Sequence, residues 1–159
     1  MAKAGLNIVS LPMCNMYLQD RGGPARTPRW RGVTAIKELR AAGVRVVLAS
    51  DNTRDPFYAH GDLDMVEVWR EATRIAHLDQ PYDPWAESVS TLAADVVGLG
   101  ESGRLRVGGP ADFVILPARS LNEVMARPYP DRIVVRDGGP IEASVPSYRE
   151  LDHLEGLRV

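Results

Sequence analysis

The chain has 159 residues, of which 45% are hydrophobic and 25% are charged, and its formal net charge is −2. This composition is typical of a soluble globular protein, with enough residues for one domain or for a part of a larger one. The small negative charge gives no electrostatic basis for binding nucleic acid or an anionic membrane, and no apolar run reaches the length of a membrane span.

The single cysteine, Cys14, limits the chemistry available to the chain. One thiol cannot form an internal disulfide or a paired-cysteine metal site, and such a chain fits a reducing, cytoplasmic compartment. The apolar stretch within residues 1–13 is too short and too polar for a signal peptide. We therefore expect a cytoplasmic protein in which Cys14 is a small buried hydrophobic residue.

The first fifty residues alternate between strand and helix patterns. Residues 6–11 and 44–49 are short β-branched apolar runs, typical of strands buried in a parallel sheet. Residues 14–32 contain several glycines and prolines and indicate a long loop, whereas residues 33–42 have helical spacing that stops at Gly43. This order predicts a βαβ unit.

The expected loop over 14–32 holds the only loose cluster of basic side chains in the sequence. Loops of this length in compact domains often carry function. We interpret the cluster first as a solvated loop, and alternatively as a contact to an anion or to another subunit. Its members are Arg21, Arg26, Arg29 and Arg31.

The second predicted strand runs directly into a polar segment, residues 50–56. Ligands bind at the C-terminal ends of the strands in parallel sheets, so this segment is in the right place for chemistry. From the spacing alone, its Asp51 is also interpretable as a turn or capping residue. Two parallel apolar strands do not form a stable sheet by themselves, which indicates that this half belongs to a larger sheet.

The chain changes from a helical to a β-rich pattern near Gly100. Amphipathic helical spacing over 61–78 is followed by helical residues 85–99, which we expect in two short pieces. Ser120 and Glu123 have the spacing of a capping box. The elements predicted after residue 100 are a strand at 113–116, a helix at 120–126 and a hairpin of strands at 132–136 and 140–143.

Residues 11–21, 31–34 and 49–58 resemble bacterial cytosine deaminase and its close relatives, the last segment reading Ala-Ser-Asp-Asn-Thr-Arg-Asp-Pro-Phe-Tyr. Residues 103–114 resemble a tail signature that many amidohydrolases share. The resemblance implies an α/β fold, namely the C-terminal part of an amidohydrolase (β/α)8 barrel (about its last two strands) plus a small β-sandwich segment. The implied parts are the barrel part at 1–100, the sandwich segment at 101–145 and a surface tail at 146–159.

The resemblance also implies roles for three residues of the segment after the second strand. Asp51 would bind the metal and move the proton of the attacking water, because a divalent metal acidifies bound water and a nearby carboxylate accepts its proton. Asn52 would border the substrate, where some family members have an acidic residue. Phe57 would stack on the base, where some members have Trp. The implied cofactor is a divalent metal, iron or zinc.

For other residues near this segment we expect mainly structural roles. We expect Asp55 to order the loop and Arg54 to form a salt bridge within it. Asn15 and Gln19 either face the mouth of the site or make capping and loop hydrogen bonds. None of the three histidines, His60, His77 and His153, belongs to a His-x-His pair.

The metal-binding histidines and the catalytic glutamate of the family would lie before Met1, and one carboxylate is not a metal site. We therefore expect this chain alone to hold no tightly bound metal, to be inactive and to expose apolar surface. The implied reaction of the complete enzyme is hydrolytic deamination of cytosine, a small-molecule substrate.

Several alternatives to this interpretation remain open. The chain could be a partner subunit that joins an N-terminal half of the barrel, part of a homo-oligomer, or a non-catalytic remnant. It could also belong to an amidohydrolase for another cyclic amidine or amide, such as a pterin or creatinine. No nucleic acid or membrane partner is expected.

Overall fold

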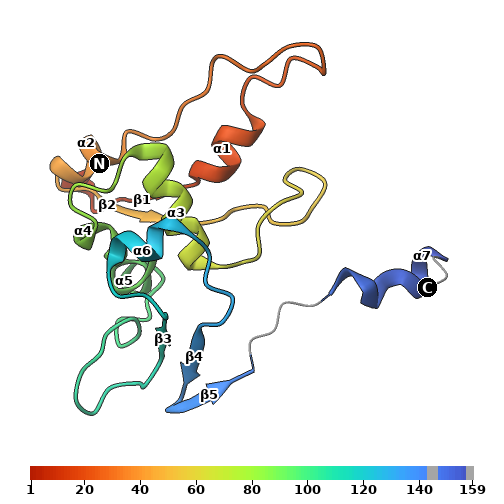
Figure 1. Ribbon diagram of the computed structural model, residues 1–159. Coiled ribbons are helices and arrows are strands. Elements are labelled where there is room, and N and C mark those ends of the chain that lie inside the picture. The colour runs from red at the N-terminus through yellow and green to blue at the C-terminus, as the bar shows by residue number, and fades with distance from the viewer. Residues whose placement is uncertain (143–146, 157–159) are drawn as a thin grey trace.

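The computed structural model describes residues 1–142 and 147–156 (Figure 1). Its elements are η1 (Ala2–Ala4), β1 (Asn7–Ser10), α1 (Pro12–Leu18), α2 (Ile36–Ala41), β2 (Arg45–Leu48), α3 (Met65–Ala76), α4 (Asp83–Ala86), η2 (Glu87–Val89), α5 (Thr91–Val96), β3 (Phe113–Ile115), α6 (Leu121–Ala126), β4 (Ile133–Arg136), β5 (Gly139–Ile141), η3 (Tyr148–Leu151) and α7 (Asp152–Glu155). Strands β1 and β2 form a parallel pair, and the antiparallel sheet has the order β3-β4-β5.

The predicted βαβ unit is confirmed. β1 and β2 pair in parallel, with Asn7 opposite Arg45 and Ser10 opposite Leu48. The connecting helix α2 is shorter than the expected 33–42, and it ends before Gly43, whose φ of 79° is a left-handed conformation that suits glycine. Both strands therefore end at the same edge of the pair, as the parallel arrangement requires.

The prediction of a loop over the whole of 14–32 is wrong at its beginning, because α1 occupies Pro12–Leu18. Pro12 stands in the first turn of this helix, where its missing N–H costs nothing and its fixed φ is already helical. The Asn15 N–H donates to the Leu11 carbonyl at 2.9 Å. A proline that follows a strand thus starts a helix here as well as ending the strand.

Helix α3 carries the predicted amphipathic stripe, and its residues Val68, Trp69 and Ala72 are buried. It begins at Met65 rather than at residue 61, because the Asp64 side chain caps it by accepting from the Val66 N–H at 2.9 Å. The expected helical stretch 85–99 is divided among α4, η2 and α5. Helices α3, η2 and α5 pack against β2, whereas α6 packs against α3 (Figure 1). Buried side chains of β2, α3, α4 and α6 share one core.

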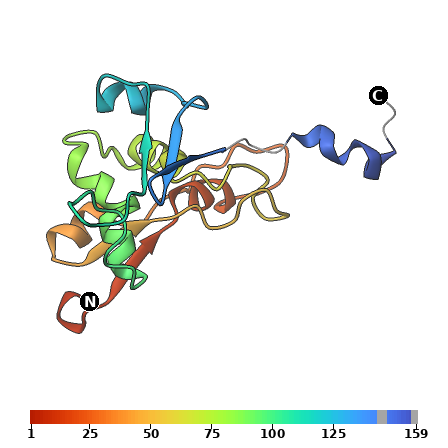
Figure 2. The ribbon, with the colours of Figure 1, turned by 90° about the horizontal axis from the view of Figure 1, so that it is seen from below.

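The predicted hairpin is confirmed as β4 and β5, joined by a turn in which Asp137 and Gly138 both have positive φ. Two positive φ values in a two-residue loop match the right-handed twist of a hairpin. β3 pairs with the other side of β4 (Figure 2). Residue 143, the expected end of β5, lies outside the described residues.

The capping box predicted for α6 forms only in part. Ser120 accepts from the Glu123 N–H at 3.3 Å, but the Glu123 carboxylate accepts from the Arg119 N–H, at 2.9 Å. The Arg119 side chain also binds Glu123, and this hydrogen bonding lowers the pKa of the Glu123 carboxyl. The Glu123 side chain therefore bonds the backbone N–H of Arg119, the residue before the N-cap Ser120.

Both sheets are small and open, and they leave apolar side chains at the surface, as expected. Val9 is 50% exposed on β1. Val114 and Ile141 are 44% and 48% exposed on the antiparallel sheet. The expected domain boundaries stay a prediction, and in the expected tail the described residues 147–156 form two short helical turns. Across the described ranges, no helix is both long and apolar enough to cross a bilayer.

Candidate active site at the edge of the parallel strands

Asp51 lies three residues beyond the end of β2, at the edge where β1 also ends. Its φ is 66°, a left-handed conformation that aspartate tolerates better than most residues because its short polar side chain can bond locally. The residue is exposed. The carboxylate is therefore available to a ligand at the expected edge of the strand pair.

Cys14 braces the turn that holds Asp51. Its thiol is 3.2 Å from the Ser50 carbonyl and 3.6 Å from the Asn52 carbonyl, which lie on either side of Asp51. Cys14 is 1% exposed, so its expected burial is confirmed, and this burial raises the pKa of the thiol. The sequence gives no signal for this contact, because the partners are 36 and 38 residues away.

Asp55 orders the loop after Asp51, as predicted. It accepts from the Asn52 side-chain amide at 2.5 Å, and from the backbone N–H groups of Phe57 and Tyr58 at 2.9 and 2.8 Å. The bond from Asn52, followed by that from Tyr58, lowers the pKa of the Asp55 carboxyl. The Asn52 amide is thus turned toward its own loop in this structure.

The same loop presents Phe57 to solvent and buries Tyr58. Phe57 is 67% exposed, whereas Tyr58 is 9% exposed. Arg54 forms the expected loop salt bridge, its partner being Asp62 at 3.3 Å. Of these two adjacent aromatic residues, Phe57 thus has a free ring face and Tyr58 packs in the core.

An aromatic cluster that was not foreseen joins this loop to α1. The rings of Tyr17, Tyr58 and His60 meet edge to face, with centroids 5.0 to 5.4 Å apart. The Arg21 guanidinium lies 4.2 Å from the centroid of the Tyr17 ring. His60 is therefore held by aromatic neighbours, and the other two histidines lie at the end of α3 and in α7.

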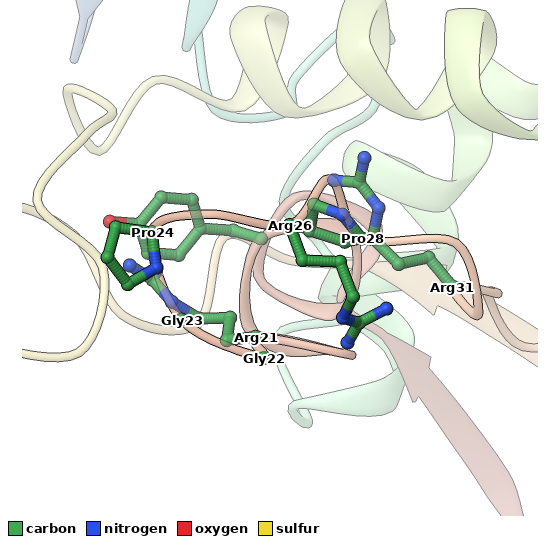
Figure 3. Close-up of a pocket in the computed structure, with 8 residues that line it drawn as sticks. Arg21, Gly22, Gly23, Pro24, Arg26, Pro28 and Arg31 are labelled. Atoms are coloured by element: carbon green, nitrogen blue, oxygen red, sulfur yellow. The ribbon is translucent and has the colours of Figure 1, made fainter.

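Three arginines of the predicted cluster, Arg21, Arg26 and Arg31, line an open cavity of about 560 Å³ together with Tyr17 (Figure 3). Gln19 makes a loop hydrogen bond, accepting from the Gly32 N–H at 2.7 Å. Asn15 is half-buried on α1. The loop alternative foreseen for Gln19 is therefore the one that the structure favours.

The described residues at this edge do not form a metal site by themselves. Within residues 1–142 and 147–156, no three His, Cys, Asp or Glu side chains come together as metal ligands. A catalytic zinc ion needs about three protein ligands, so the described side chains do not fit a complete metal site. Asp51 alone is a suitable single ligand at this edge.

Comparison with known proteins gives a consistent group of relatives. The model of the amidohydrolase family matches residues 1–141. A pterin deaminase of Rhizobium rhizogenes is 61% identical over 155 residues, which are 98% of this chain and 35% of that protein. A 5-methylthioadenosine/S-adenosylhomocysteine deaminase of Bacillus thuringiensis is 34% identical over 92 residues, 54% of this chain and 20% of that protein.

Among solved structures, 5-methylcytosine deaminase of Klebsiella pneumoniae with phosphonocytosine has a TM-score of 0.71 and 30% identity. The match covers 92% of this chain and 37% of that one. The same enzyme with 5-fluorocytosine gives a TM-score of 0.70 and 29% identity, over 92% and 36% of the two chains. The chain thus spans about a third of the length of the pterin deaminase and of the 5-methylcytosine deaminase.

Proposed function

We propose that this chain, which belongs to the amidohydrolase family, supplies the proton-transferring carboxylate and an aromatic substrate contact for hydrolytic deamination of a heterocyclic amine. The expected resemblance to the C-terminal part of a deaminase-like amidohydrolase is confirmed, as is the expected fold class. The substrate and the roles of single residues are the proposal.

The observation that carries the proposal is the position of Asp51. An exposed carboxylate lies just beyond a parallel strand, where substrates of such sheets bind, and its turn is braced by a buried side chain. In the proposed step, water attacks the ring carbon that bears the amine, and Asp51 accepts the water proton. Asp51 then gives that proton to the amine nitrogen, the C–N bond breaks and ammonia leaves.

A pterin is the substrate that we favour over cytosine. Identity to the pterin deaminase is 61% over nearly the whole chain, whereas identity to the 5-methylcytosine deaminase is 30%. Both rings contain an amino-substituted cyclic amidine, so the same chemistry serves either. The exposed ring of Phe57 offers a flat surface on which a bicyclic ring could stack with a larger overlap than a pyrimidine.

The proton-transfer role that we propose for Asp51 does not depend on a metal. The family is typically metal-dependent, and Asp51 could serve as one ligand of an iron or zinc ion. Because the described residues do not complete a ligand set, we assign to Asp51 only the proton transfer. Asn52 could reach the substrate only by releasing its 2.5 Å bond to Asp55.

The experiment is a chimera. The C-terminal segment of the Rhizobium rhizogenes pterin deaminase is replaced by this chain, to which it is 61% identical. Ammonia release from pterin and from cytosine is then measured, with the parent enzyme as the positive control and the chain alone beside it. We expect the chimera to deaminate pterin in preference to cytosine, and the Asp51→Asn chimera to lose at least about a hundredfold in kcat.

Each outcome decides between the alternatives. A folded chimera that deaminates neither compound would refute the proposal and favour a non-catalytic remnant. A preference for cytosine would restore the substrate expected from the sequence. Ammonia release by the chain alone would show that it builds a complete site by itself or as an oligomer.

A further inference from the structure

Residues 19–32, which we call the arm, form a closed and internally braced loop. The Asp20 carboxylate accepts from the Arg26 guanidinium at 2.6 Å, and from the backbone N–H groups of Arg29 and Trp30 at 2.6 and 3.0 Å. The ion pair with Arg26, followed by these two backbone bonds, holds the pKa of Asp20 well below its usual range. The arm is therefore preorganised although it contains no regular secondary structure.

The arm and Tyr17 of α1 surround the open cavity of about 560 Å³, which we call the arm cavity (Figure 3). Cavities of roughly 300–1,000 Å³ are the size that small ligands occupy in proteins. Every charged side chain that lines the arm cavity is an arginine, namely Arg21, Arg26 or Arg31. The cavity thus has the size of a ligand site and a lining of one charge sign.

Two of these three arginines keep their charge uncompensated. Arg26 is paired with Asp20, whereas neither Arg21 nor Arg31 forms an ion pair with any acid in residues 1–142 and 147–156. The Arg21 guanidinium lies 4.2 Å from the centroid of the Tyr17 ring, a contact that uses none of its N–H donors. Arg31 donates one bond, from Nη1 to the Met16 carbonyl at 2.9 Å, and its Nε and Nη2 donors make no other bond within the same residues.

We propose that the arm cavity is an oxyanion site, which takes a carboxylate or a phosphate group. A guanidinium group presents its N–H donors in a planar fork that matches the oxygen pairs of both groups. The charge of Arg21 and Arg31 disfavours a cationic ligand and is compensated by an anionic one. Of the alternatives that the sequence leaves open for these arginines, the proposal selects the anion, and it is independent of the proposed function.

The arm cavity adjoins the loop that carries Phe57. Tyr17 lines the cavity, and its ring meets that of Tyr58 at 5.0 Å. The arm and this loop follow β1 and β2, which end at the same edge of the parallel pair, and loops in such positions flank ligand sites. The oxyanion therefore has two sources to be distinguished, a free anion and an anionic substituent of the substrate.

Inorganic phosphate is titrated into the purified chain at low ionic strength and binding is followed by calorimetry, with sodium chloride as the control salt. We expect one saturable site per chain with a dissociation constant below about 1 mM, weakened by added salt. Arg21→Ala and Arg31→Ala should each weaken phosphate binding at least about tenfold. Arg21→Lys, which keeps the charge and loses the planar fork, should weaken it less.

Arg29→Ala is the matched control. It removes the same charge from the same arm, but the Arg29 side chain does not line the arm cavity. Its effect on phosphate binding should stay below about twofold, and circular dichroism checks that every variant is folded. The absence of saturable phosphate binding by the unaltered chain would overturn the proposal. Equal weakening by Arg29→Ala and Arg21→Ala would overturn it as well, because it indicates a general effect of charge.

The chimera distinguishes the two sources. The KM is measured for pterin and for a pterin that bears a carboxylate. If the oxyanion belongs to the substrate, Arg21→Ala raises only the KM for the carboxylated compound, at least about tenfold, and phosphate competes with it. If the oxyanion is a free anion, Arg21→Ala abolishes phosphate binding and leaves both KM values unchanged. This second measurement rests on the proposed function, whose failure is recognised separately because pterin itself is then not deaminated.

Discussion

Both terminal nitrogens of the Arg132 guanidinium donate hydrogen bonds to the Asp64 carboxylate, at 2.8 and 2.7 Å, across 68 residues of sequence. The same carboxylate caps α3 through the Val66 N–H. One partly buried acid thus holds the start of a core helix and the chain just before β4. This pair is a direct polar link between the helical part and the antiparallel sheet.

Arg132→Met should lower the free energy of unfolding by about 1–2 kcal/mol, because it leaves the Asp64 carboxylate partly buried without its bidentate partner. The two side chains are 23% and 19% exposed, so solvent screens their interaction little. Urea denaturation measures the change. Arg119→Met, which removes an ion pair whose arginine is 91% exposed, is the control and should change stability by less than about 0.5 kcal/mol.

The same pair predicts a dependence on pH. Burial would raise the pKa of Asp64, but the hydrogen bonds from Arg132 and the Val66 N–H outweigh it and leave the pKa lowered. The stabilisation is therefore complete above the ordinary carboxyl pKa of about 4 and is lost as the pH falls through the lower folded value. Arg132→Met should lose less stability than the wild type over this acid range, and an equal loss would contradict the assignment.

Asp51→Gly should remove deamination by the chimera while leaving the fold intact. Glycine adopts a φ of 66° without strain, and this gain offsets the greater backbone entropy that glycine loses on folding. We expect the free energy of unfolding to change by less than about 1 kcal/mol. Thermal denaturation and ammonia release are measured on the same preparation. Retained activity would exclude Asp51 from proton transfer.

Phe57 and Tyr58 should respond oppositely to truncation. Phe57→Ala removes an exposed ring, so it should raise the KM for pterin about tenfold and leave the melting temperature unchanged. Tyr58→Ala removes a buried ring that contacts Tyr17 and His60, and it should cost about 3 kcal/mol of stability. Steady-state kinetics of the chimera and denaturation of the chain separate the two effects. A stability loss in Phe57→Ala would contradict the assignment of Phe57 to substrate contact and of Tyr58 to the core.

These residues show how far the sequence carries the prediction. The strands and α3 follow from local apolar periodicity, and the role of Asp55 follows from bonds that span two or three residues. Helix α1 was missed because Pro12 is compatible with both a loop and a first helical turn. The Cys14 brace and the aromatic cluster depend on contacts between distant segments, which no local pattern specifies.

The antiparallel sheet should bind a hydrophobic dye. Val114, Val134 and Ile141 lie opposite one another across the three strands and therefore share one face. Two of them are nearly half exposed, which leaves an apolar ladder in contact with water. Replacing Val114 and Ile141 by Thr should reduce the fluorescence of bound dye. Leu105→Ala, at a 74% exposed position outside this sheet, is the control and should not reduce it. Dye binding that is absent in the unaltered chain would contradict the exposure of this face.

The Cys14 thiol should react slowly with thiol-labelling reagents in the folded chain. The thiolate is the reactive form, and burial both raises the pKa of this thiol and blocks access to it. We expect labelling of the native chain at pH 8 to be at least about a hundredfold slower than that of free cysteine, because it requires local opening. In urea the chain should take up one equivalent of the labelling reagent, since it has one cysteine. Native labelling at the rate of free cysteine would show that α1 does not cover this turn.

Two substitutions of Cys14 test the brace itself. Cys14→Ser keeps a donor to the Ser50 carbonyl and Cys14→Val does not. Only Cys14→Val should therefore loosen the Asp51 turn and lower the activity of the chimera.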